Sequence, residues 1–206
     1  MRAAALILAL ACAGAAAQAP HEHAHRFSGA EKWAQVFDDP ARDAWQKPHE
    51  VIEALGLAPD AVVADIGAGT GYFAARLARM LPKGTVYAVD LEPDMVKYLG
   101  ERARREELAN LVPVQAAAGD PRLPAKVDLA LLVNVYHHLD ARTTYFAKLG
   151  AARVAIIDFR MDSKAGPRAG RVSPETVKRE MAAAGYALGS EHDFLPNQYF
   201  LVFAAR

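Results

Sequence analysis

Three glycines at alternate positions, Gly67, Gly69 and Gly71, directly follow the short apolar run Val62 to Ile66. A short apolar run rich in β-branched residues is typical of a buried strand. A helical pattern begins immediately after the glycines, near Tyr72. A strand, a glycine turn and a helix in this order bring bare backbone N–H groups to the carboxyl edge of a sheet. The sequence therefore predicts an α/β fold with a small ligand against this loop.

Beyond the loop, β-rich runs alternate with helical stretches, which predicts a mostly parallel sheet with helices on both faces. We expect seven strands, near 61–66, 85–89, 111–116, 127–133, 152–158, 186–191 and 198–203. We expect four helices in this part, near 72–80, 93–107, 141–149 and 174–184. The third and fourth strands are too close in sequence for a full crossover helix. The last two strands are close enough to form an antiparallel hairpin.

The first 17 residues are typical of a secretory signal peptide, because Arg2 precedes an uncharged run from Ala3 to Ala17. Small residues at the end of the run suit cleavage before Gln18, and a buried Ala-rich helix is the alternative interpretation. The one cysteine, Cys12, lies inside the run, so cleavage leaves a mature chain without a thiol. A lipoprotein anchored through Cys12 is less favoured, since Ala9 stands where a larger aliphatic residue is usual. We expect a periplasmic or secreted protein.

Residues 18–27 are expected to form a disordered leader with His21, His23 and His25, which offer metal ligands only if the segment becomes extended. Residues 28–56 are expected to hold two or three helices, the first opening at Ser28 in a capping box with Glu31. Trp33, Val36 and Phe37 fall on one face of that helix. Residues 57–206 are expected to form the main domain, for which we predict no metal site.

The balance of charges limits the class of partner. Lys and Arg together number 24, as do Asp and Glu, so the formal net charge is zero. This balance gives no electrostatic reason to expect nucleic acid or an anionic membrane as the main partner. A small molecule is the partner that we predict, and the oligomeric state stays open.

The glycine spacing identifies the class of ligand. A dinucleotide loop follows G-x-G-x-x-G, but here Tyr72 occupies the sixth position and the third glycine comes one residue early. A nicotinamide-dependent oxidoreductase is therefore disfavoured. The form D-x-G-x-G-x-G, which begins at Asp65, instead resembles motif I of the class I S-adenosylmethionine-dependent methyltransferases. A purely structural glycine turn is the alternative.

Two further carboxylates extend this resemblance. Asp90 ends the second expected strand, where an acid can accept both hydroxyls of a ribose; its alternative role is a cap for the helix at Pro93. Asp120 follows the third strand, where members of the family place a residue that accepts the adenine amino group; its alternative is a turn residue before Pro121.

The resemblance covers the chain from about Val51 to the C-terminus. It implies a single Rossmann-like domain with a seven-stranded sheet, a C-terminal antiparallel hairpin and an N-terminal helical extension. The stretches 37–48 and 135–146 further resemble a group of exported bacterial methyltransferases of unassigned substrate, and the ubiquinone-biosynthesis methyltransferases are more distant. The cofactor implied is S-adenosylmethionine. The residues that we expect to contact it are Asp65, Gly67, Ala68, Gly69, Gly71, Asp90, Leu91 and Asp120.

Candidates for the acceptor side follow the fourth expected strand, whose end faces the transferable methyl group in this fold. Methyl transfer is an in-line displacement, so the protein supplies alignment, and a base where the acceptor carries a proton. His137 or His138 is our candidate base, and Asn134 and Tyr136 are candidates to orient the acceptor. Structural roles for all four stay open. We predict a methyltransferase for a small molecule; the alternative is an exported binding protein that keeps the nucleoside site without catalysis.

Overall fold

A computed structural model describes residues 29–206. The predicted signal peptide, Cys12 and the three N-terminal histidines therefore lie outside the described residues. The described chain begins with short helices, as the sequence predicts for this segment. They are α1 (Ala30–Phe37), the 3₁₀ turn η1 (Pro40–Arg42), α2 (Asp43–Gln46) and α3 (Pro48–Ala54).

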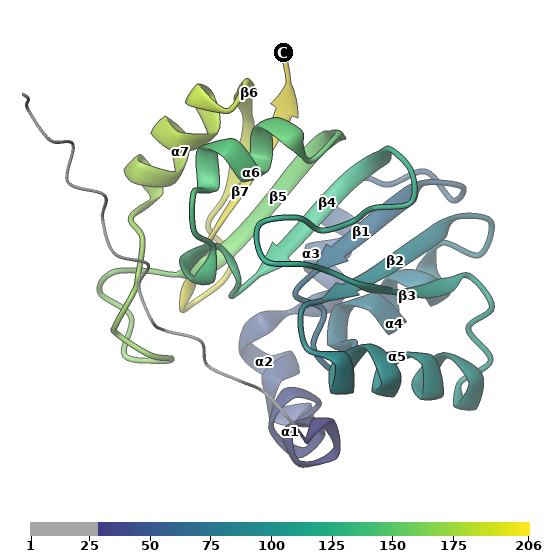
Figure 1. Cartoon of the computed structure of the whole chain (residues 1–206). Helices are drawn as coiled ribbons and strands as arrows, with labels where there is room; N and C mark the ends of the chain where they lie inside the picture. Colours follow the sequence, from purple (N-terminus) through teal and green to yellow (C-terminus); the bar gives the residue numbers. More distant parts are fainter. Residues whose placement is uncertain (1–28) are drawn as a thin grey trace, which may run out of the picture.

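One seven-stranded sheet forms the centre of the molecule, and its strand order is β3-β2-β1-β4-β5-β7-β6 (Figure 1). The strands from β1 to β5 run parallel, whereas β7 is antiparallel to both β5 and β6. This confirms the predicted fold class, including the antiparallel hairpin at the end of the chain. The strands are β1 (Val62–Ile66), β2 (Thr85–Asp90), β3 (Leu111–Gln115), β4 (Val127–Val133), β5 (Ala151–Phe159), β6 (Tyr186–His192) and β7 (Gln198–Ala205).

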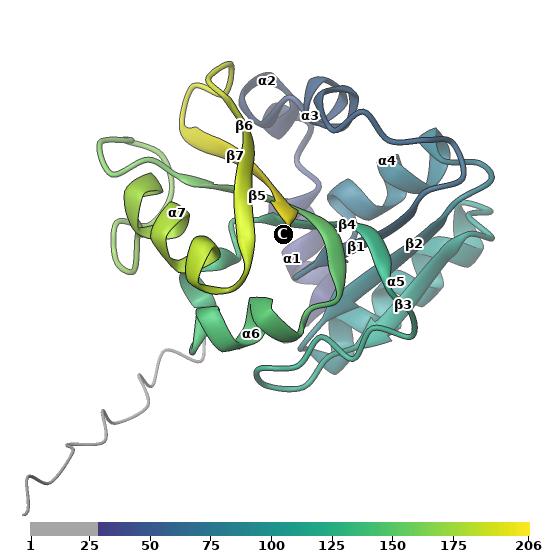
Figure 2. The same ribbon diagram turned by 90° about the horizontal axis from the view of Figure 1, so that it is seen from above.

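Helices cover both faces of the sheet. The remaining helices are α4 (Tyr72–Met80), α5 (Pro93–Arg105), the 3₁₀ turn η2 (Tyr136–His138), α6 (Arg142–Lys148) and α7 (Pro174–Ala183). Apolar residues of α3, α4 and α5 share one core cluster with one face of the strands, and those of α6 and α7 share a second cluster with the other face. Figure 2 shows α3 and α4 on one side of the sheet and α6 and α7 on the other. As predicted, no helix separates β3 from β4.

The direction in which the chain winds reverses between β1 and β4. From β1 it proceeds to β2 and β3 on one side, and it then returns to add β4 and β5 on the other. Ile66 of β1 pairs with Leu132 of β4. Ala68 comes two residues after Ile66, and Asn134 comes two residues after Leu132. Ligands of open α/β sheets bind where the strand order reverses, outside the carboxyl ends of the strands. We refer to the carboxyl ends of β1 and β4 as the switch point.

The N-cap of α1 is Gly29, in the left-handed region and without a side-chain cap. The capping box that we expected at Ser28 falls on a residue outside the described part of the chain. Val36 is exposed, because the face that α1 turns inward is centred on Ala30 and not on Val36. Among residues 29–206, no helix is long and apolar enough to cross a membrane.

Candidate functional site

The glycine loop has an internal reason for its glycines. All three have positive φ, at 70° for Gly67, 56° for Gly69 and 91° for Gly71, a region that other L-residues adopt at a cost. A Cβ on Gly67 would lie 2.4 Å from Val135 Cγ2, and one on Gly71 would lie 2.8 Å from Leu99 Cδ2. The protein's own side chains therefore approach the loop at two of these glycines, a cause that the sequence analysis did not foresee.

The N-terminal helices cover the loop at the third glycine. A Cβ on Gly69 would lie 3.3 Å from the Phe37 ring at the end of α1. Arg102 of α5 fastens this arrangement, since its Nη1 donates to Asp38 Oδ1 and to Thr70 O, both at 2.9 Å. Figure 1 shows α1 and α2 beside the carboxyl ends of the parallel strands. The N-terminal extension is thus part of the candidate site.

Asp90 lies directly against the glycine loop. Its Oδ2 accepts from Gly69 N at 2.8 Å, and its Oδ1 accepts from Glu92 N at 2.9 Å. Burial raises the pKa of Asp90, while the backbone N–H groups that it accepts from act in the opposite direction. The bond to Glu92 N forms a turn ahead of α5, whose N-cap Glu92 has no side-chain cap, so Asp90 does not cap that helix directly. The ribose role stays a prediction, which the position at the edge of the sheet supports.

Asp65 connects the end of β1 to the start of α4. The side chain is 3% exposed and accepts from the backbone N–H of Ala74. Burial, with the nearby charge of Asp90 as a smaller cause, raises its pKa from 3.8 to about 7. The Asp65 carboxyl is therefore easier to protonate than an exposed one.

Replacing Asp65 by Asn is expected to stabilise the fold above pH 7 and to have little effect near pH 4. Because the folded-state pKa is raised, the unfolded chain ionises first, and stability falls as pH rises from about 4 to about 7. Asn removes this loss, which is on the order of 2–4 kcal/mol at pH 8. Urea titrations of both proteins at pH 4 and pH 8 measure the difference. Equal stability differences at the two pH values would contradict the raised pKa.

Asp120 lies in a turn after β3. Its backbone pairs with Ala117, its Oδ1 accepts from Arg122 N at 2.8 Å, and the residue is exposed. These are the contacts of a turn residue, the alternative that we considered. Among the described residues, we find no hydrogen bond from Asp120 to the glycine loop or to Asp90, so an adenine contact at this position stays a prediction.

His137 and Asp158 form a buried pair at the carboxyl ends of β4 and β5. His137 Nδ1 lies 2.9 Å from Oδ1 and 2.8 Å from Oδ2 of Asp158, and the two side chains are 6% and 2% exposed. Asp158 also accepts from the backbone N–H groups of His137 and Phe159. The other ring nitrogen, His137 Nε2, is buried and has no hydrogen-bond partner in residues 29–206. A carboxylate that accepts from one imidazole nitrogen leaves the other with a lone pair.

The remaining acceptor-side candidates lie in different environments. His138 is exposed, with its ring centroid 4.0 Å from that of His137. Tyr136 is fully buried, stacks on Phe146 and donates to Glu180 Oε2 at 2.6 Å. Our prediction that Tyr136 orients an acceptor conflicts with this position, because its hydroxyl hydrogen is used within the core. Asn134 stands at the switch point, as expected.

A loop between β5 and α7, residues 160–173, borders the His137 ring. A Cβ on Gly170 would lie 3.9 Å from His137 Cδ2. The guanidinium of Arg171 holds this loop, because it donates to six backbone carbonyls within it. They belong to Arg160, Met161, Ser163, Ala165, Gly166 and Pro167. The loop is therefore organised around one side chain.

Some of these residues were missed by the sequence analysis. Asp158 ends the fifth strand, just as Asp65 and Asp90 end the first two, so the same rule applied to that strand would have found it. Arg171 gave no such signal, because it lies in a stretch without helical or strand periodicity.

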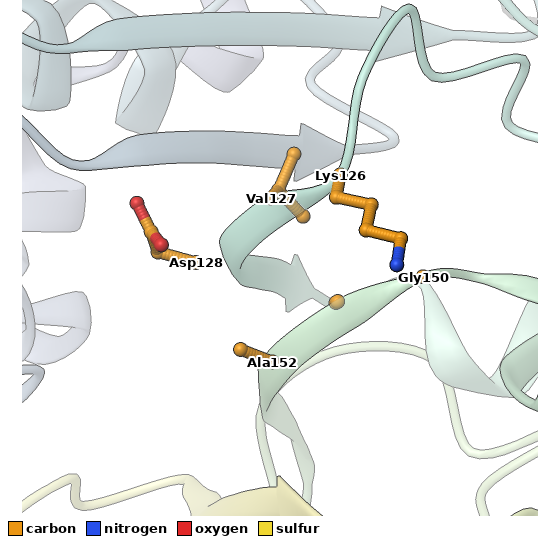
Figure 3. A pocket seen from close by; sticks show the side chains of 6 residues that line it. Lys126, Val127, Asp128, Gly150 and Ala152 are labelled. Carbon is orange, nitrogen blue, oxygen red and sulfur yellow. The ribbon is translucent and has the colours of Figure 1, made fainter.

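The hollow in Figure 3 lies at the opposite edge of the sheet, at the amino ends of β4 and β5. Lys126 and Asp128 border it on different sides. None of the predicted site residues lines this hollow, so we do not associate it with the site.

The residues at the switch point fit S-adenosylmethionine. The carboxylate of Asp90 has spare lone pairs for ribose hydroxyls after accepting two backbone N–H groups. Leu91 beside it is 53% exposed, an apolar surface that a purine ring can cover. Thr70 Oγ1 is buried and has no hydrogen-bond partner in the described part of the chain. A polar atom in this state at the loop is suited to a ligand.

Comparison with known proteins agrees with this geometry. The sequence profile of a family described as "Methyltransferase domain" matches residues 63–155. The chain is 35% identical over 75 residues to protein-L-isoaspartate O-methyltransferase of Aeropyrum pernix. The matched residues make up 36% of this chain and 29% of that protein. It is 33% identical over 89 residues to a tRNA(Phe) (4-demethylwyosine(37)-C(7)) aminocarboxypropyltransferase of Methanocaldococcus jannaschii, over 42% of this chain and 36% of that protein. The chain thus matches about a third of the length of these curated relatives.

Solved structures match over more of the chain. The fold superimposes on a SAM-dependent methyltransferase from Aquifex aeolicus with a TM-score of 0.78 and 25% identity, covering 86% of this chain and 98% of that one. A magnesium protoporphyrin IX methyltransferase from Synechocystis, solved with bound SAH, has a TM-score of 0.68 at 17% identity, over 88% and 95% of the two chains, and supports the fold alone. Residues 63–155 thus match a methyltransferase domain, the whole chain has the fold of a SAM-dependent methyltransferase, and the cofactor that these matches support is S-adenosylmethionine.

Proposed function

We propose that the protein methylates a small molecule at a group that carries a proton, with His137 as the general base. The observation that carries this proposal is the buried pair of His137 and Asp158 with an unpartnered Nε2. An imidazole held by a carboxylate through Nδ1 presents a basic Nε2, an arrangement that serves proton abstraction in several unrelated enzymes.

Bound S-adenosylmethionine supplies a methyl group activated by the sulfonium charge. Asp158 fixes the His137 tautomer with the proton on Nδ1 and stabilises the imidazolium that forms when Nε2 takes a proton. The loop 160–173 borders the ring, whose Nε2 is buried. Asp90 and the glycine loop hold the nucleoside, and general-base catalysis of this kind contributes typically 100- to 10,000-fold to a rate.

The proposal of a small acceptor is supported by the absence of net charge, which gives no field to attract nucleic acid. The Synechocystis enzyme, which is named for the methylation of magnesium protoporphyrin IX, has the same fold. One curated relative is instead named for the transfer of an aminocarboxypropyl group. The test must therefore identify which part of the cofactor moves.

The experiment uses S-adenosylmethionine with ³H in the methyl group and ¹⁴C in the carboxypropyl chain. The protein is incubated with this probe and a small-molecule extract of bacterial cells, and the products are separated by chromatography. We expect ³H alone in a new product. Transfer of ¹⁴C would indicate the other reaction, and binding of S-adenosylhomocysteine without any transfer would favour the non-catalytic alternative.

We also propose that the protein is exported and belongs to the group of exported bacterial methyltransferases that residues 37–48 and 135–146 resemble. The uncharged run from Ala3 to Ala17 supports export. When the full chain is produced in a bacterium with a periplasm, the periplasmic product is expected to begin at Gln18. N-terminal sequencing of both cell fractions is the measurement, and an intact Met1 found only in the cytoplasm would contradict the proposal.

A further inference from the structure

A chain of buried side-chain amides links the N-terminal helices to the switch point. Gln46 of α2 donates through Nε2 to Gln198 Oε1 of β7 at 3.0 Å. Gln198 donates through Nε2 to Asn134 Oδ1 at 2.7 Å. Both glutamines are 0% exposed. Three residues far apart in the sequence thus share one hydrogen-bonded row.

Arg42 fixes the direction of this row. Its Nη2 and Nε donate to Gln46 Oε1 at 2.8 and 3.3 Å. A guanidinium has donors and no acceptor, so Gln46 must turn its oxygen toward Arg42 and its amino group toward Gln198. Reversing any amide in the row would leave two buried donors or two buried acceptors facing each other, which is costly. The oxygen of Asn134 is consequently committed to Gln198, and its amino group is left for a ligand.

The backbone holds Asn134 in this position. Its φ is 58°, a left-handed conformation that Asn tolerates, and its backbone N donates to Ile157 O at 2.8 Å. The next residue, Val135, packs against Gly67. The side chain is half-buried, and in residues 29–206 its Nδ2 has no hydrogen-bond acceptor and is not fully buried. A ligand at the switch point can therefore reach it.

We propose that Asn134 is a hydrogen-bond donor of fixed direction, so that the ligand group it meets is an oxygen acceptor and not an amine. This inference rests on the proposed function for the identity of the ligands. The oxygen belongs either to the carboxylate of the cofactor or to the methyl acceptor, as a carboxylate, a carbonyl or an ionised hydroxyl. Gln198, Gln46 and Arg42 act as positioning residues for Asn134.

The decisive variant is Asn134→Asp. It keeps an oxygen for Gln198 Nε2 and tolerates the left-handed backbone, so the row and the fold are expected to persist. It replaces only the donor that faces the ligand by an acceptor. Asn197→Asp is the matched control, because it adds the same charge next to Gln198 without touching the row.

Titration calorimetry with S-adenosylhomocysteine and with 5′-methylthioadenosine, which lacks the carboxylate, identifies the source of the oxygen. If it is the cofactor carboxylate, Asn134→Asp weakens binding of the first roughly 10- to 100-fold and leaves the second nearly unchanged. If it is an acceptor oxygen, both affinities persist and transfer of labelled methyl to the extract falls by a similar factor. Either result supports the proposal.

Two results would overturn it. They are an Asn134→Asp protein that binds and transfers like the wild type or better, and an Asn197→Asp protein that loses as much as Asn134→Asp. Should the wild type bind S-adenosylhomocysteine but transfer no methyl group, the proposed function fails on its own. The two titrations then decide alone, and unchanged affinities for Asn134→Asp overturn the donor role.

Discussion

The Asp158→Asn protein transfers methyl groups roughly 100 to 10,000 times more slowly than the wild type, while S-adenosylhomocysteine binds almost equally well to both. This is the result that we expect, because an Asn side chain can turn its amino group toward His137 Nδ1. The imidazole proton then moves to Nε2, where no lone pair is left to accept a proton. Rates are measured under single-turnover conditions with the labelled cofactor.

A second measurement on the same variant is independent of the acceptor. The ¹⁵N chemical shifts of the His137 ring report its tautomer, and we expect the proton on Nδ1 in the wild type and on Nε2 in Asp158→Asn. Asp162→Asn, an exposed change in the adjoining loop, is the control and should alter neither the rate nor the tautomer. A normal rate in Asp158→Asn, together with the altered tautomer, would remove His137 from the role of base.

The second large effect is expected for Asp90→Ala, whose affinity for S-adenosylhomocysteine should fall roughly 10- to 1000-fold. The predicted ribose role implies the loss of two hydrogen bonds to a carboxylate. Gly69 N also loses its acceptor, so the loop itself becomes less well held. Calorimetric titration measures the affinity, and circular dichroism verifies that the fold persists.

The control for this variant is Asp128→Ala. Asp128 Oδ2 accepts from Val62 N at 2.8 Å, so this change also removes a carboxylate that holds a backbone N–H, but at the amino end of β1. Asp94, the next aspartate along the chain, is unsuitable as a control. Its Oδ2 accepts from Gly29 N at the start of α1, and α1 carries Phe37 onto the glycine loop. Equal affinities of the Asp90 and Asp128 variants would leave Asp90 with only a structural role at the glycine loop and the turn before α5.

The parts of the site predictable from the sequence are those encoded by local spacing. The glycine loop, Asp65 and Asp90 follow strand ends at fixed offsets, and the alternation of strands and helices places them at one edge. The amide row could not be predicted in this way, since Gln46 and Gln198 are 152 positions apart and each alone is an ordinary polar residue. The approach of Val135 and Leu99 to the glycines likewise depends on tertiary packing that no local pattern encodes.

In the loop around Arg171, the shape of the backbone does not depend on which side chains the loop exposes. Its geometry is set by one cation and six main-chain oxygens, atoms that every residue type possesses. The exposed side chains of Lys164 and Arg168 take no part in it. Exchanging these two side chains is therefore expected to leave the backbone beside His137 in place, so the proposed acceptor preference could be varied here at little cost to folding.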